Sequence, residues 1–137
     1  MSIPTQARAA TRTVRFQGGV LRFLDALESR VVTRPPREVD DAQHWLVTEL
    51  GGGMTTIRQV TTGLFLAAAP DGECAVVTGD RRTTHSGRWR IEDFGGGFAS
   101  IEHVGSGRYL EATIGGDFRV VIRSAASSEQ TWRLGDA

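Results

Sequence analysis

Residues 51–67 read GGGMTTIRQVTTGLFLA, and residues 95–111 read GGGFASIEHVGSGRYLE. Besides the glycine triplet, the two stretches share apolar and glycine positions 44 residues apart: Ile57 and Ile101, Gly63 and Gly107, Leu66 and Leu110. A fixed period of 20–50 residues is the sequence mark of a repeat architecture. The chain is therefore built from copies of one unit.

Tryptophans follow the same period and extend it over the chain. The only three are spaced 44 and then 43 residues apart, at Trp45, Trp89 and Trp132. Burying one such ring removes about 150–250 Å² from water, so each is expected first of all in the core. The three copies span about residues 12–50, 51–94 and 95–137 of a single domain. We expect residues 1–11 to be a loose N-terminal arm.

The first copy is the most diverged of the three. Its residues 22–26 (RFLDA) match residues 108–112 (RYLEA) two repeat lengths later. On the third strand, we align Val31-Val32-Thr33 with Val76-Val77-Thr78, and the latter valines with Val120-Val121. These alignments predict strands at matching places in all three copies.

Each copy contains four short strand signals. In the second copy, β-branched residues 54–60 precede a Gly turn, and Pro70-Asp71-Gly72 is a strong turn before residues 74–78. Residues 89–92 alternate apolar and polar, as a half-buried strand does. Residues 20–28 also fit a helical period, but they align with strands elsewhere. About twelve strands, and an all-β fold, are predicted.

The number of copies distinguishes between the known folds that are built from four-stranded repeats. A β-propeller needs about four or more blades to close. A closed barrel with a cap of hairpins, the β-trefoil, accommodates three. The sequence predicts a β-trefoil of three four-stranded repeats.

The repeat resembles that of the ricin B-like β-trefoil family and its Gln-x-Trp signature. The signature stands at Gln43-His44-Trp45 and Gln130-Thr131-Trp132, whereas copy two has Gly87-Arg88-Trp89. The family's Ile-Arg…Gly-x-Tyr/Phe-Leu run is matched by residues 57–66 and 101–110. The resemblance implies a non-catalytic, lectin-like module with a shallow sugar pocket on each copy.

The resemblance also implies which residues contact sugar. The family's Asp, which accepts hydrogen bonds from two vicinal hydroxyls, falls on Asp25, Ala67 and Glu111 in the three copies. Because alanine cannot accept hydrogen bonds through its side chain, copies one and three are expected to bind. Copy three is expected to be the weaker, since Glu is one methylene longer than Asp.

No aromatic residue follows the third strand, where the family places its stacking ring. Arginines stand there instead, and they are either solvated or able to recognise an acidic group bidentately. The glutamines of the signature are also often structural in the family. The predicted carbohydrate-binding residues are Asp25, Arg34, Gln43, Glu111, Arg123 and Gln130.

Composition argues against several other functions. Sixteen basic and sixteen acidic residues balance, so no charge favours nucleic acid, and no apolar stretch is long enough for membrane insertion. Cys74 is the lone cysteine and is expected as a small, half-buried strand residue. His44, His85 and His103 lack metal-ligand spacing, and no catalytic or cofactor motif occurs. We expect no cofactor and no enzyme activity.

A second function class remains open. A β-trefoil can also bind protein, as inhibitors of the mushroom type bind proteases, through an exposed loop. The candidate loops are Arg34-Pro35-Pro36-Arg37 and Asp80-Arg81-Arg82-Thr83. Proline lowers the ordering cost of binding in the first, and an exposed Arg in either loop suits a trypsin-like pocket. All basic residues are arginine, which is typical of a GC-rich bacterial genome. Without a visible signal segment, a cytoplasmic location is expected.

Overall fold

The computed structural model describes residues 11–18, 22–36, 42–78, 87–114, 116–124 and 130–136. Residues 1–10 of the expected arm, Arg37, residues 80–83 and His85 lie outside these residues, whereas Thr11, expected as the last residue of the arm, begins the first strand. The described residues form twelve strands, as predicted: β1 (Thr11–Gln17), β2 (Phe23–Leu27), β3 (Arg30–Arg34), β4 (Trp45–Gly51), β5 (Met54–Gln59), β6 (Phe65–Ala68), β7 (Cys74–Val77), β8 (Trp89–Gly95), β9 (Phe98–His103), β10 (Arg108–Ala112), β11 (Val120–Arg123) and β12 (Trp132–Asp136).

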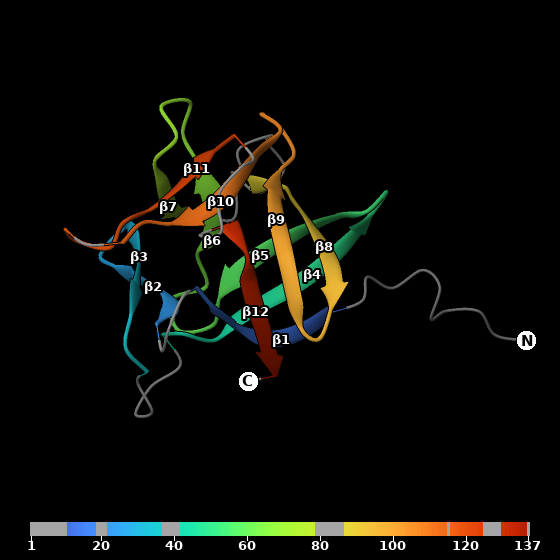
Figure 1. The fold of residues 1–137 in the computed structure, drawn as a ribbon, viewed down its shortest axis with the longest axis horizontal. Helices are drawn as coiled ribbons and strands as arrows, with labels where there is room; N and C mark the ends of the chain where they lie inside the picture. Colours follow the sequence, from blue (N-terminus) through green and yellow to red (C-terminus); the bar gives the residue numbers. More distant parts are fainter. Residues whose placement is uncertain are drawn as a thin grey trace, which may run out of the picture.

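Six of the strands close into a barrel. β1 pairs with β4 and β12, and the ring continues through β5, β8 and β9 by antiparallel pairing alone. The other six form three hairpins, β2–β3, β6–β7 and β10–β11, which lie together at one end of the barrel (Figure 1). This is the β-trefoil predicted from the repeat.

The core contains the repeated apolar positions. Trp45, Trp89 and Trp132 are fully buried, in one cluster with Leu24, Leu66 and Leu110. Each indole Nε1 donates a hydrogen bond of 3.0 Å to one of these leucine carbonyls, in copy order. A buried indole N–H needs such a partner. The same contact therefore fixes one hairpin to the barrel in each of the three copies.

The strand ladders correct the predicted alignment of copy two. Asp25 faces Val32, Ala67 faces Ala75 and Glu111 faces Val121. The third strand of copy two is therefore displaced by two residues from the sequence alignment: Val76 corresponds to Thr33 and to Ile122, and not to Val31 or Val120. The sequence pattern does not reveal this displacement, because side chains in a strand alternate with a period of two. A shift of two residues therefore keeps every side chain on the same face of the sheet.

The three hairpins meet around equivalent positions. Single bridges join Arg30 to Ala75, Glu73 to Val121 and Arg119 to Val32, each linking one copy to the next. The ladder gives Arg30, Glu73 and Arg119 the same place in their copies. The cap is thus closed by three equivalent bridges.

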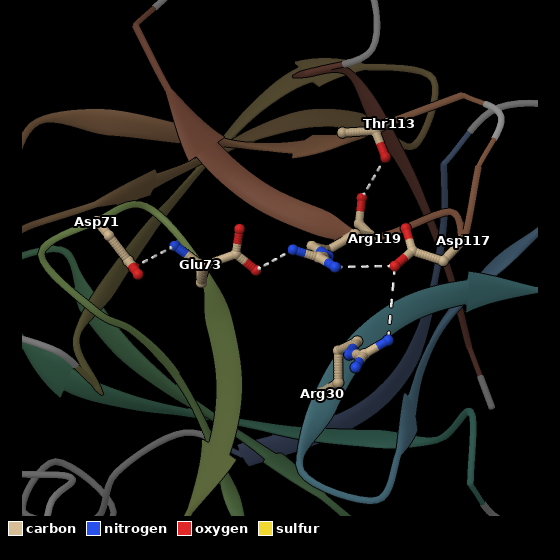
Figure 2. Close-up of polar contacts among 6 residues, drawn as sticks. All are labelled: Arg30, Asp71, Glu73, Thr113, Asp117 and Arg119. Atoms are coloured by element: carbon tan, nitrogen blue, oxygen red, sulfur yellow. Dashed lines mark hydrogen bonds and ion pairs between the residues drawn. The ribbon is translucent and has the colours of Figure 1, made fainter.

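An ionic cluster reinforces these bridges (Figure 2). The Arg119 guanidinium contacts Glu73 Oε1 at 3.0 Å and Asp117 Oδ2 at 2.9 Å. Asp117 Oδ2 also lies 3.5 Å from Nη1 of Arg30. The cluster joins all three copies, although its side chains are substantially exposed and water screens them.

Replacing Asp117 by asparagine tests the cluster through pH. The hydrogen bond from Arg119 holds the pKa of Asp117 below its ordinary value of 3.8. A carboxylate whose pKa is lower in the folded than in the unfolded state stabilises the fold at pH values above its unfolded-state pKa. This stabilisation is lost as the pH falls through the folded-state pKa. The natural chain should therefore melt slightly higher than Asp117→Asn at pH 7, and the difference should vanish well below pH ~4. Melting curves at both pH values measure it. Asp136→Asn is the control, and an equal difference at pH 7 and at low pH contradicts the assignment.

Candidate functional site

The predicted carboxylates and glutamines meet at the same place in copies one and three. In each copy the first strand of the hairpin, β2 or β10, approaches the segment that precedes Trp45 or Trp132. The Trp45 indole is hydrogen-bonded to the Leu24 carbonyl. Gln43, two residues before Trp45, is therefore brought to Asp25, the residue after Leu24. The Trp132–Leu110 bond places Gln130 beside Glu111 in the same way. The core contact thus assembles the polar pair.

In copy one the pair is completely enclosed. Gln43 Nε2 donates to Asp25 Oδ2 at 3.2 Å and to the Pro35 carbonyl at 2.8 Å. The Ala26 amide donates to Asp25 Oδ1 at 2.7 Å. Asp25 and Gln43 are both 0% exposed. Both carboxylate oxygens are thus used inside the protein, where an unpaired charge is costly.

Copy three has the same arrangement closer to the surface. Gln130 Nε2 donates to Glu111 Oε1 at 3.1 Å and to the Ser124 carbonyl at 2.6 Å. Arg123 Nη1 lies 3.2 Å from Glu111 Oε2, and its side chain is 61% exposed. Glu111 is still largely buried, at 7% exposure, whereas its partner Arg123 reaches the surface.

The glutamine bridge joins three segments in both copies. Pro35 and Ser124 directly follow Arg34 and Arg123, which the ladders place at equivalent positions. Each glutamine thus fastens the end of the hairpin's second strand to the carboxylate on its first. Sequence reasoning did not anticipate these two carbonyls, because a main-chain acceptor leaves no mark on residue type.

The two predicted arginines have different surroundings. The Arg34 side chain is half-buried and makes no hydrogen bond or ion pair with the described part of the chain, whereas Arg123 pairs with Glu111. Copy two has Ala67 and Gly87 at the carboxylate and glutamine positions, so the bridge is chemically impossible there. Its surface at this point is a shallow depression that includes Ala67, Pro70 and Val77.

Sequence analysis overlooked one aromatic residue near the predicted sites, Phe118. It lies before β11, the third strand of copy three, and not after it. Phe118 has φ of +55°, in the left-handed region, and matches Gly72 of copy two, at +93°. The Arg22 guanidinium lies 3.5 Å from the Phe118 ring centroid and also bonds Thr33. One face of the ring is therefore covered by a contact between copies one and three, so that face cannot stack on a ligand.

Among the described residues, the histidine and cysteine side chains have packing roles. No three His, Cys, Asp or Glu side chains there are arranged to hold a metal ion. His103 Nδ1 is 2.9 Å from Ser106 Oγ, and its ring packs 5.0 Å from the Trp89 ring. Cys74 is more buried than expected, at 3% exposure, and burial raises the pKa of its thiol far above the ordinary value. None of the described segments is a helix that could span a membrane.

Comparisons with solved structures find the same fold in proteins of different kinds. The designed threefold-symmetric protein ThreeFoil superposes with a TM-score of 0.80 at 19% identity, over 91% of this chain and 99% of that one. The Polyporus squamosus lectin, solved with a sialylated epitope, gives 0.78 at 15% identity over 91% and 49%. The Clostridium thermocellum exo-β-1,3-galactanase gives 0.81 at 18% identity over 92% of this chain but 30% of the enzyme.

The sequence comparisons identify the family. No curated protein matches the chain. The model of the ricin-type β-trefoil lectin domain-like family matches residues 41–120, which include copy two, the end of copy one and the start of copy three. Because this match covers more than half of a chain with the β-trefoil fold, the protein belongs to the ricin-type β-trefoil lectin domain-like family.

Proposed function

We propose that the protein is a non-catalytic carbohydrate-binding module whose main sugar contact is the Glu111–Arg123 pair of copy three. Family membership supports carbohydrate binding, and the glutamine-held carboxylates of copies one and three carry the assignment of the site. Lectins are also among the similar folds, including SeviL bound to asialo-GM1 saccharide.

Copy three offers the chemistry that a sugar diol needs. Each Glu111 oxygen has one protein donor and retains capacity for a second hydrogen bond. Arg123 uses one N–H on Glu111 and has others directed to solvent. Vicinal hydroxyls, which both donate and accept, match this carboxylate–guanidinium edge. Arg123 and Ser124 also line a shallow depression of about 530 Å³ beside this edge, whose other walls include Asp71 and Glu73 but not Glu111.

Copy one has a smaller direct role in this proposal. Because Asp25 is fully enclosed, it orients Gln43 and the Pro35 carbonyl and does not meet ligand without local movement. In this proposal copy three is the stronger site, the reverse of the order expected from side-chain length. With no stacking ring after the third strand, we expect a dissociation constant near the millimolar range, about −4 kcal/mol.

Glu111→Gln is expected to weaken sugar binding about tenfold or more, because it removes the charge that both hydroxyl donors and Arg123 need. A glycan array identifies the sugar, and calorimetry at high sugar concentration then compares the natural chain, Glu111→Gln and Arg123→Gln. Ala67→Ser, at the equivalent position of copy two, is the matched control and should leave binding unchanged.

Two results would count against the lectin assignment. One is the absence of binding on the array and of heat with any common mono- or disaccharide. The other is binding that Glu111→Gln and Arg123→Gln leave at the natural level. In either case protein binding through the exposed Pro35-Pro36 segment becomes the leading function. Protease inhibition assays then test that alternative.

A further inference from the structure

The outer face of the β4–β5 hairpin carries a depression unlike the sugar surfaces. Strand alternation turns Trp45 and Val47 into the core and leaves Leu46 and Leu50 outside. Across the hairpin Leu46 faces Arg58, and Gly51 faces Met54. The resulting depression measures about 440 Å³, with walls from Leu46, Leu50, Met54, Phe65, Arg58 and Arg88.

In the part of the chain that the structure describes, its two arginines have no acidic counterpart. No carboxylate lines the depression, and neither guanidinium forms an ion pair with the described residues. Arg58 lies 5.9 Å from the Phe65 ring centroid. Arg88 Nε is shielded from solvent and has no hydrogen-bond partner. Two like charges without a counter-ion favour an anion beside them, so an anion in the depression would offset the charge of both guanidiniums.

The next hairpin shows how the same positions are neutralised elsewhere. In the β8–β9 pair, Arg90 and Glu102 face each other at the positions of Leu46 and Arg58. There Arg90 Nη1 and Glu102 Oε1 form a salt bridge of 3.2 Å. On the β8–β9 hairpin, Glu102 thus supplies a carboxylate for the arginine on this face. At the β4–β5 hairpin, the described residues combine two guanidiniums with apolar walls and supply no carboxylate.

We propose that this depression binds a small amphipathic carboxylate, an alkyl or aryl acid with a single negative group. Its apolar body would lie on Leu46, Leu50 and Met54, and its carboxylate between Arg58 and Arg88. The planar guanidinium fork matches a carboxylate in geometry and charge. The volume fits a small molecule. The site is on the barrel wall and is separate from the Glu111–Arg123 sugar contact of copy three.

Octanoate, with octan-1-ol as the uncharged analogue, is the probe. Calorimetry should show octanoate binding at least about tenfold more tightly than octan-1-ol, since only octanoate meets the arginines. In NMR titrations of the labelled protein, amide shifts should concentrate at Leu46, Met54 and Phe65. This comparison needs no variant, so a folding defect cannot obscure it.

Variants then test whether the two arginines bind the carboxylate of octanoate. Arg58→Gln and Arg88→Gln should each reduce octanoate affinity about tenfold and leave octan-1-ol affinity unchanged. Arg90→Gln, which removes an already paired arginine, is the matched control and should bind octanoate normally. The proposal is overturned if octanoate fails to bind at millimolar concentration, if octan-1-ol binds equally well, or if all three variants behave alike. Sugar binding is unaffected by any of these outcomes, so the two functions are tested separately.

Discussion

Trp89→Ala should lower the free energy of unfolding by about 3–5 kcal/mol, the usual cost of deleting a large buried aromatic side chain. The ring is 0% exposed, and its Nε1 donates to the Leu66 carbonyl at 3.0 Å. Alanine leaves a cavity beside His103 and removes that donor. A domain of this size is usually stable by about 5–15 kcal/mol, so the loss is a large share of the total.

Urea unfolding followed by fluorescence of the two remaining tryptophans measures this loss. Trp89→Phe, which keeps a ring but not the N–H, should cost clearly less. Phe94→Ala is the control, because Phe94 is 59% exposed and such substitutions usually stay within about 0.5 kcal/mol. A Trp89→Ala cost near that of Phe94→Ala would show that the repeated tryptophan contact does not hold the hairpins to the barrel.

The repeat made the fold predictable from one sequence. Trp45, Trp89 and Trp132 keep an even spacing, and the structure gives all three the same buried contact. A motif that recurs three times constrains far more than a single propensity, because each copy must satisfy the same packing. The strands, the core leucines and the family follow from this one regularity.

Pairing register was less accessible than strand location. Short valine-rich runs such as Cys74–Val77 look alike when shifted by two residues, because both registers bury the same face. Only the ladder, in which Leu66 faces Val76 while Leu24 faces Thr33, distinguishes them. Without conformational information, sequence alignment of such a strand is ambiguous by an even number of residues.

The candidate sites show a similar division. Sequence motifs grouped Asp25 with Gln43 and Glu111 with Gln130, and the structure brings both pairs together. Their depth was not predictable, since Asp25 is sealed while the partner of Glu111 is open to solvent. The arginine depression was not predicted either. Its walls combine the β4–β5 hairpin with Phe65 of β6 and with Arg88, which is thirty residues further along the chain than Arg58. No local sequence pattern indicates that these residues meet.

Gly18→Ala is expected to destabilise the protein by about 1–3 kcal/mol, the cost of forcing extra volume into a packed core. A Cβ on Gly18 would lie 2.6 Å from Cζ3 of Trp132 and 2.9 Å from Cε3. Real Cβ contacts are essentially never shorter than 3.0 Å, and Trp132 is fully buried, so the ring cannot move into solvent. The strain is steric, since the φ of Gly18 is outside the left-handed region.

The ladders explain why position 18 needs glycine. Trp45 faces Gln59 and Trp89 faces His103, whereas continuing the Gln17–Arg133 register by one residue sets Trp132 opposite Gly18. The ring of copy three therefore occupies space that a side chain fills in the other copies. Gly135→Ala is the control, because a Cβ there has nothing within 4 Å and its φ is not left-handed. If thermal melting shows equal effects for Gly18→Ala and Gly135→Ala, Trp132 has room to shift, and the close packing of this corner of the core is refuted.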